Sequence, residues 1–200
     1  MTDLTEEQDR VEIVDDIGLI ILASPPVNAL ARPLREAMIT ATDRLNATPE
    51  VRVIAVLSDL HVFSAGADIR EFSRPLRRPY LQDVCANLEA SHKPVVAVLH
   101  GAAFGGGLGI AMASHARVAL PGTRLGLTEV HVGILPGAGG TQRTPRLTGV
   151  STAIDLIVSG RKFDAAEGLA HGIIDRIMPG TPRAVALQAA KDVLSGALPT

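Results

Sequence analysis

The stretch VVAVLHGAAFGGGLGI, residues 95–110, decides the fold class. Its first five residues are apolar and mostly β-branched, which is typical of a strand covered on both faces. A glycine cluster follows, and the pattern predicts a helix over residues 106–114 that begins among the glycines. A buried strand that leads through glycines into a helix indicates the α/β class.

The alternation of strand and helix continues in both directions. The pattern predicts strands at 11–15, 17–23, 51–57, 116–120, 124–127 and 175–178. It predicts helices over 34–45, 81–89, 151–159, 164–172 and 182–194, with Asp164 and Glu167 forming a capping pair. No linker or repeat of fixed period divides the chain, so we expect residues 1–200 to form one domain.

Composition narrows the function classes. Hydrophobic residues make up 46% of the chain but aromatic residues only 2%, so the core must be aliphatic and rich in small residues. A formal net charge of −2 gives no reason to expect nucleic acid or an anionic membrane as partner. The one cysteine, Cys85, excludes an internal disulfide framework. The polar start MTDLTEEQDR resembles no targeting signal and the apolar runs are too short to span a bilayer, so we expect a cytoplasmic protein.

Common catalytic motifs do not fit. The glycines of residues 100–110 lack the G-x-G-x-x-G order of a dinucleotide site, and no glycine loop carries the Lys-Ser/Thr of a P-loop. The chain has no G-x-S-x-G serine elbow and no H-E-x-x-H pair, and one cysteine cannot form a thiolate zinc site. We therefore predict no metal site.

Four stretches together carry a more specific signal. They are NAL at 28–30, FSAGADIREF at 63–72, KPVVAV at 93–98 leading to GGG at 105–107, and GLTEV at 126–130 followed by GILPGAGGTQR at 133–143. In this order and spacing they resemble the enoyl-CoA hydratase/isomerase (crotonase) superfamily. The hydratase/isomerase part of multifunctional fatty-acid oxidation enzymes is the most similar. The resemblance implies a crotonase-like spiral of ββα turns. It also implies a short helical C-terminal segment, because single-domain relatives continue for several more helices.

The resemblance also implies a site for an acyl-CoA thioester. By motif position, the backbone N–H groups of Ala67 and Gly106 form an oxyanion hole for the negative charge that develops on the thioester oxygen. Substrate-binding positions are Ala65, Asp68, Ile69, Arg70 and Gly109. Coenzyme A is then part of the substrate and no separate cofactor is expected. The family resemblance further implies a homo-oligomer, a trimer or a dimer of trimers.

One departure from the family pattern concerns the chemistry. Hydratases of this family usually carry two glutamates, and here Glu129 matches one while Gly109 replaces the other. Glu129 alone could still move a proton from the α-carbon to the γ-carbon of a 3-enoyl-CoA, and burial among Val130, Val132 and Ile134 would raise its pKa. We therefore expect double-bond isomerisation. A weak or differently supported hydratase and a non-catalytic acyl-CoA-binding protein remain alternatives.

Other polar groups are weaker candidates. Glu129 and His131 are two residues apart and are expected to share a strand face, where His131 is more simply a packed or half-exposed residue. The basic cluster Arg70, Arg74, Arg77 and Arg78 is either a solvated face or a contact for CoA phosphates. Cys85 is expected to be an inert thiol.

Overall fold

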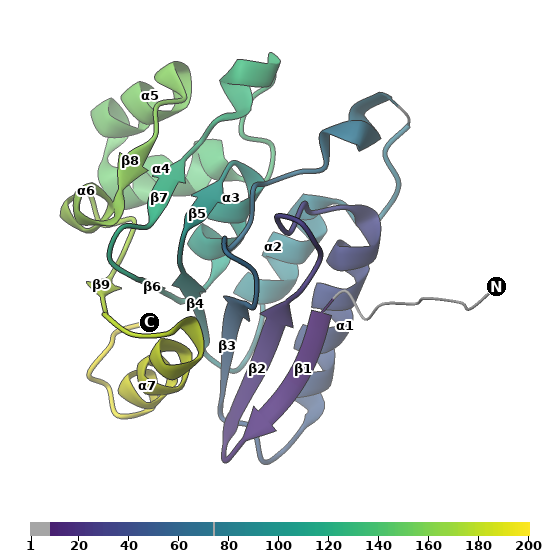
Figure 1. The fold of residues 1–200 in the computed structure, drawn as a ribbon, viewed down its shortest axis with the longest axis vertical. Helices are drawn as coiled ribbons and strands as arrows, with labels where there is room; N and C mark the ends of the chain where they lie inside the picture. The colour runs from purple at the N-terminus through teal and green to yellow at the C-terminus, as the bar shows by residue number, and fades with distance from the viewer. Residues whose placement is uncertain (1–8, 74) are drawn as a thin grey trace.

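The computed structural model describes residues 9–73 and 75–200, so the acid-rich residues 1–8 and Arg74 of the basic cluster lie outside the described part (Figure 1). The chain begins with a hairpin. Strands β1 (Asp9–Val14) and β2 (Ile17–Leu22) pair antiparallel around Asp15, whose φ of 55° provides the left-handed turn.

The main sheet has six strands in the order β1-β2-β3-β4-β6-β9. Strands β3 (Val53–Ser58), β4 (Val95–Leu99), β6 (Ala116–Ala119) and β9 (Arg176–Ile177) join β2 in parallel. Every residue of β2, β3, β4 and β6 is buried. Both faces of the sheet are therefore covered, which is the arrangement predicted from the continuous apolar runs in the sequence.

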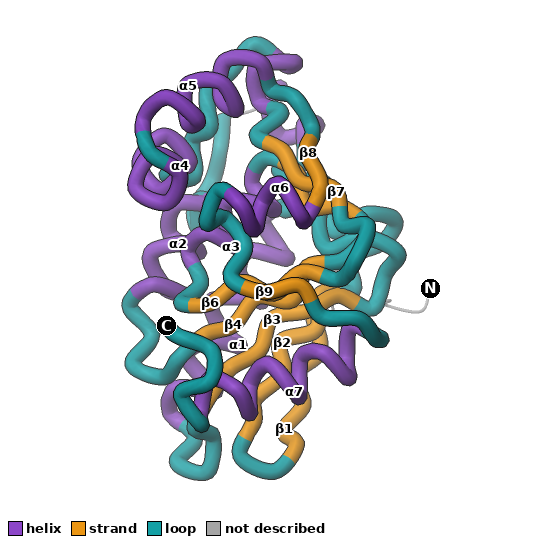
Figure 2. Tube along the Cα trace, turned by 90° about the vertical axis from the view of Figure 1, so that its left-hand side faces the viewer, coloured by secondary structure: helices purple, strands orange, loops and turns teal. Residues whose placement is uncertain are grey.

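Alternate residues of these strands pack into two separate clusters. Ile54, Val56 and Ala97 face helices α1 (Arg32–Ala47), α2 (Leu81–Glu89) and α3 (Gly106–Ala113). Val53, Ala55 and their neighbours face helix α7 (Pro182–Leu194), which Figure 2 shows along one face of the sheet. Successive side chains of each strand point to opposite faces of the sheet, so the residues of one apolar strand contribute alternately to the two clusters.

A second, smaller layer lies beside the first. Strands β5 (Ala102–Phe104), β7 (Arg124–Gly126) and β8 (Phe163–Asp164) form a three-stranded sheet. Single bridges join Ser64 to Ala103 and Ala29 to Gly66 and extend this layer to earlier turns of the chain. Each turn therefore contributes a long strand to one sheet and a short extended piece to the other before its helix, as in β4–β5–α3.

The C-terminal third is mostly helical. It contains α4 (Gly140–Thr148), α5 (Val150–Ser159), α6 (Ala165–Ala170) and α7, with α4 and α5 at the end of the molecule away from α7 (Figures 1 and 2). The Asp164 carboxylate accepts a hydrogen bond from the Glu167 N–H, so the predicted helix cap is confirmed. No helix of the described residues has both the length and the apolar character needed to cross a membrane.

Candidate active site

A cavity of about 710 Å³ is lined by most of the predicted site residues. Ala65, Ala67, Ile69, Gly106 and Glu129 all line it. They come from the loop after β3, the start of α3 and the segment after β7. The lining is completed by Arg35, Gly66, Glu71, Phe72, Leu76, Tyr80, Leu81, Gln82, Phe104, Gly105, Thr128, His131, Val132, Ile134, Leu135, Gly137, Ala138 and Lys162.

The amides of Ala67 and Gly106 lie next to one another. A methyl group added at Gly106 would lie 3.6 Å from the Ala67 nitrogen, and one added at Gly66 would lie 3.3 Å from the Gly106 nitrogen. Neither N–H donates a hydrogen bond within the described part of the chain. Gly106 is the first residue of α3, where backbone N–H groups have no intrahelical acceptor and the helix dipole favours an anion. Two neighbouring backbone donors that have no acceptor in the described part of the chain therefore belong to residues that line the same cavity.

A chain of hydrogen bonds holds the loop that carries Ala67. The buried Asn28 donates from Nδ2 to Ser58 Oγ at 2.8 Å and to the Phe63 carbonyl at 2.9 Å. Ser64 Oγ donates to the Asn28 carbonyl and accepts from the Gly66 N–H. Gly66 has φ +98°, a backbone conformation that other residues rarely adopt. The NAL and FSAGAD motifs are thus locked together, which fixes the direction of the Ala67 amide.

Glu129 lies close to the same two amides. A methyl group added at Gly105 would lie 3.3 Å from Glu129 Oε1, so the carboxylate lies against the residue that precedes Gly106. Its Oε2 atom is buried and has no hydrogen-bond partner among the described residues. Burial raises the pKa of the Glu129 carboxyl above its usual value, as expected from the sequence. A carboxyl that has a raised pKa and one buried oxygen without a partner is typical of a general base or acid.

Two details expected around Glu129 are wrong. Glu129–Val132 forms a short 3-10 helix (η2) rather than a strand, and Gly133, with φ 75°, ends it. Val130, Val132 and Ile134 do not bury Glu129, because all three are substantially exposed. The carboxylate is instead enclosed by Gly105 and the other cavity walls.

Gly109 is not part of the cavity lining. It lies in buried α3, and a methyl group there would be 3.3 Å from the Cβ of Ala138, which does line the cavity. A side chain at position 109, where the family's other glutamate would start, would therefore be in tight contact with the Ala138 methyl group.

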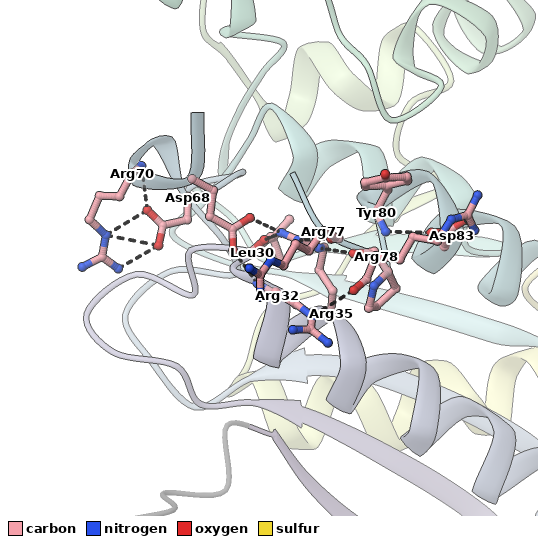
Figure 3. Close-up of polar contacts among 11 residues, drawn as sticks. Leu30, Arg32, Arg35, Asp68, Arg70, Arg77, Arg78, Tyr80 and Asp83 are labelled. Carbon is pink, nitrogen blue, oxygen red and sulfur yellow. Dashed lines mark hydrogen bonds and ion pairs between the residues drawn. The ribbon is translucent and has the colours of Figure 1, made fainter. Parts of the chain in front are cut away.

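The expected CoA loop divides into two parts. Ala65 and Ile69 line the cavity, whereas Asp68 and Arg70 do not. Asp68 is buried and accepts from Arg70 through the backbone N–H and through Nε and Nη2, and this contact lowers the pKa of the Asp68 carboxyl. The Arg70 side chain is 84% exposed, so it lies on the surface beside the loop (Figure 3).

Sequence reasoning missed an internal arginine that organises the adjoining residues 69–73 and 75–80. Arg35 of α1 donates from Nη1 to Glu71 Oε2 at 2.7 Å and to the Leu30 carbonyl at 2.6 Å, and from Nε to the Pro79 carbonyl at 2.7 Å (Figure 3). Its side chain is only 6% exposed. Glu71 also accepts from the Arg32 N–H through Oε1 at 2.8 Å. Arg35 therefore anchors the segment that presents Ile69, Phe72 and Leu76 to the cavity.

Of the other titratable residues, some line the cavity and others do not. His131 and Lys162 line the cavity, with Lys162 Nζ 4.7 Å from the centre of the Phe104 ring. His100 Nε2 lies 2.7 Å from the Leu60 carbonyl and does not line the cavity. Burial raises the pKa of the Cys85 thiol to about 12, which fits an inert cysteine. In the described ranges, no three His, Cys, Asp or Glu side chains converge on a possible metal position.

Most of the chain is similar to known proteins. The sequence model of the enoyl-CoA hydratase/isomerase family matches residues 12–193. The chain belongs to this family. Among solved structures, an enoyl-CoA hydratase from Thermoplasma volcanium superposes with a TM-score of 0.89 at 28% identity, over 97% of this chain and 80% of that one. The crotonase-like spiral expected from the resemblance is therefore confirmed.

The curated relatives of this family differ in length. The peroxisomal bifunctional enzyme of Danio rerio is 44% identical over 180 residues, which are 90% of this chain and 25% of that enzyme. A probable enoyl-CoA hydratase of Bacillus subtilis is 38% identical over 165 residues, which are 79% of this chain and 64% of the relative. The chain thus spans about a quarter of the multifunctional relatives and about two thirds of the single-activity one.

Proposed function

We propose that this chain binds an acyl-CoA thioester in the 710 Å³ cavity and isomerises the double bond of a 3-enoyl-CoA, with Glu129 as the only acid–base side chain. One observation carries the proposal. Glu129, whose buried Oε2 has no partner among the described residues, lines the same cavity as Ala67 and Gly106, whose backbone N–H groups donate no hydrogen bond there. Such a combination suits a reaction in which a proton leaves carbon while negative charge gathers on a neighbouring oxygen.

The proposed steps use only these groups. The Glu129 carboxylate accepts the proton from the α-carbon, and the electron pair of that C–H bond moves into the thioester, so that charge develops on its oxygen. The N–H groups of Ala67 and Gly106 stabilise that oxygen. Glu129 then returns the same proton to the γ-carbon, and the double bond is conjugated with the thioester. A raised pKa helps this shuttle, because the carboxyl must both accept and release a proton.

Hydration of a 2-enoyl-CoA is the second candidate function. The named hydratase relatives favour it, and Thr128, His131 and Lys162 provide polar groups in the cavity lining that could hold water. Against it stands Gly109, because this position provides no second carboxylate to polarise the water. Losing one positioned acid–base group typically costs about 10²–10⁴-fold in rate.

A paired assay of isomerisation and hydration tests the proposal. Wild type should isomerise 3-enoyl-CoA readily and hydrate 2-enoyl-CoA poorly. A Gly109→Glu, Ala138→Gly double variant removes the methyl group that blocks position 109 and should raise hydration at least about tenfold. Gly109→Gln with the same Ala138→Gly change is the matched control without the carboxylate. Efficient hydration by wild type would reject the one-base proposal. Acyl-CoA binding without either reaction would favour a binding protein.

The proposed oligomer rests on family resemblance. A homotrimer or a dimer of trimers is the expected assembly, and light scattering after size-exclusion chromatography measures it directly. The cytoplasmic location also stays a prediction, which fractionation of the native cell would test.

A further inference from the structure

A second cavity of about 410 Å³ adjoins the active-site cavity. It is lined by Arg32, Arg35, Glu71, Pro75, Leu76 and Arg77. Arg35, Glu71 and Leu76 line both cavities, so these three side chains form the wall between them. Leu76 is 51% exposed, and it is the part of this wall that is not fixed by an ion pair.

The charges in this second cavity are unbalanced. Its lining contains three arginines and one glutamate. Glu71 is paired with Arg35, and Arg32 is paired with Glu36, which lies outside the lining. The exposed Arg77 has no ion pair and its side chain makes no hydrogen bond within residues 9–73 and 75–200. The cavity lining therefore includes one arginine, Arg77, that has no anionic partner among the described residues.

The active-site cavity leads to this charge along an apolar path. Ile69, Phe72 and Leu76 line it with exposed apolar side chains that an acyl chain would cover. A chain that continues past Leu76 meets Arg32 and Arg77, which a methyl end would desolvate without compensation. Glu71 shows how a carboxylate is held in this place, with one oxygen on a guanidinium and the other on a backbone N–H.

We propose that the second cavity binds a carboxylate at the far end of the acyl chain, so that the substrates include ω-carboxyacyl-CoA thioesters. This inference rests on the proposed function, because the thioester end must occupy the first cavity. The recognition is electrostatic, with Arg77 as the principal partner of the terminal carboxylate.

Calorimetric titration with pairs of acyl-CoA and ω-carboxyacyl-CoA of matched length tests the inference, over a series of chain lengths. At the length that reaches Arg77, wild type should bind the ω-carboxy ligand about tenfold more tightly, equivalent to about 1.4 kcal/mol. In Arg77→Met, the ratio of the two dissociation constants should fall to about one. In Arg77→Lys, part of the preference for the ω-carboxy ligand should remain. The preference should also weaken as salt is raised.

Arg44→Met is the matched control, since Arg44 is an exposed arginine in the last turn of α1 and lines neither cavity. It should keep the full preference. Equal weakening of both ligands by Arg77→Met would assign Arg77 to the CoA phosphates and overturn the inference. Wild-type preference for the plain acyl chain, or no preference at any length, would also overturn it. Failure of every acyl-CoA to bind would instead reject the proposed function and the inference with it.

Discussion

The hydrogen bonds and the ion pair of Arg35 allow us to predict how much stability is lost when its guanidinium is removed. Arg35→Met keeps the apolar stem of the side chain but removes a guanidinium that pairs with Glu71 and donates to the carbonyls of Leu30 and Pro79. Removing one partner of a buried ion pair costs about 3–5 kcal/mol, and each buried acceptor left without a donor about 1–3 kcal/mol. Glu71 and the carbonyls near the cavity can turn to water, so we expect the lower end, a loss of about 3 kcal/mol in the free energy of unfolding.

Urea denaturation followed by circular dichroism measures this loss. Arg44→Met is again the control and should stay within about 0.5 kcal/mol of wild type. Adding Glu71→Gln to Arg35→Met should recover part of the stability, because it removes the carboxylate left without its partner. A loss below about 1 kcal/mol for Arg35→Met, or no recovery in the double variant, would refute the view that this ion pair anchors residues 69–80.

Three further outcomes follow from the site. Glu129→Gln should stabilise the fold above neutral pH, because burial raises the pKa of Glu129 and so penalises its ionised form. In urea titrations, this gain in the free energy of unfolding should shrink as the pH falls through the raised pKa and should vanish below pH 4.5. A gain that persists in acid would contradict this prediction. Gly66→Ala should weaken acyl-CoA binding at least about tenfold, because Gly66 has φ +98° and the new methyl group would lie 2.8 Å from the Phe104 carbonyl oxygen. If calorimetry shows unchanged binding, the Ala67 amide is not placed as described here. Cys85 should resist thiol reagents at pH 8 until the protein unfolds, because burial raises its pKa to about 12; equal labelling of folded and unfolded protein would disprove it.

The strands of the main sheet and most helices were predictable because their hydrophobic periods are simple, whereas the short strands β5 and β8 were not predicted. The bounds predicted for α2 and α7 agree with the structure, and Leu34, Met38, Ala41 and Leu45 are buried on one face of α1. Helix α4 escaped prediction, because its sequence GTQRTPRLT is polar and contains Pro145. Apolar residues alternate with other residues after Glu129, and this pattern led us to expect a strand there. In the structure Val132, Ile134 and Leu135 line the cavity and are exposed, so no sheet is needed to explain the pattern.

The site was predictable only in part, because its oxyanion donors are backbone groups. No side-chain pattern marks the N–H groups of Ala67 and Gly106, so motif resemblance alone pointed to them. Arg35 did leave a signal, since it is a charged residue directly after Leu34 and three residues before Met38, within the apolar face of α1. A buried arginine on such a face needs a carboxylate partner, and Glu71 is that partner.

Exchange of the α-proton tests the role of Glu129 most directly. Wild type should exchange the α-protons of a bound 3-enoyl-CoA with deuterium or move them to the γ-carbon, as followed by NMR in D₂O. Glu129→Gln keeps the size of the side chain but cannot accept the proton, so this transfer should fall by at least about 10²-fold while acyl-CoA still binds. Transfer at the wild-type rate in Glu129→Gln would show that another group moves the proton and would contradict the one-base account.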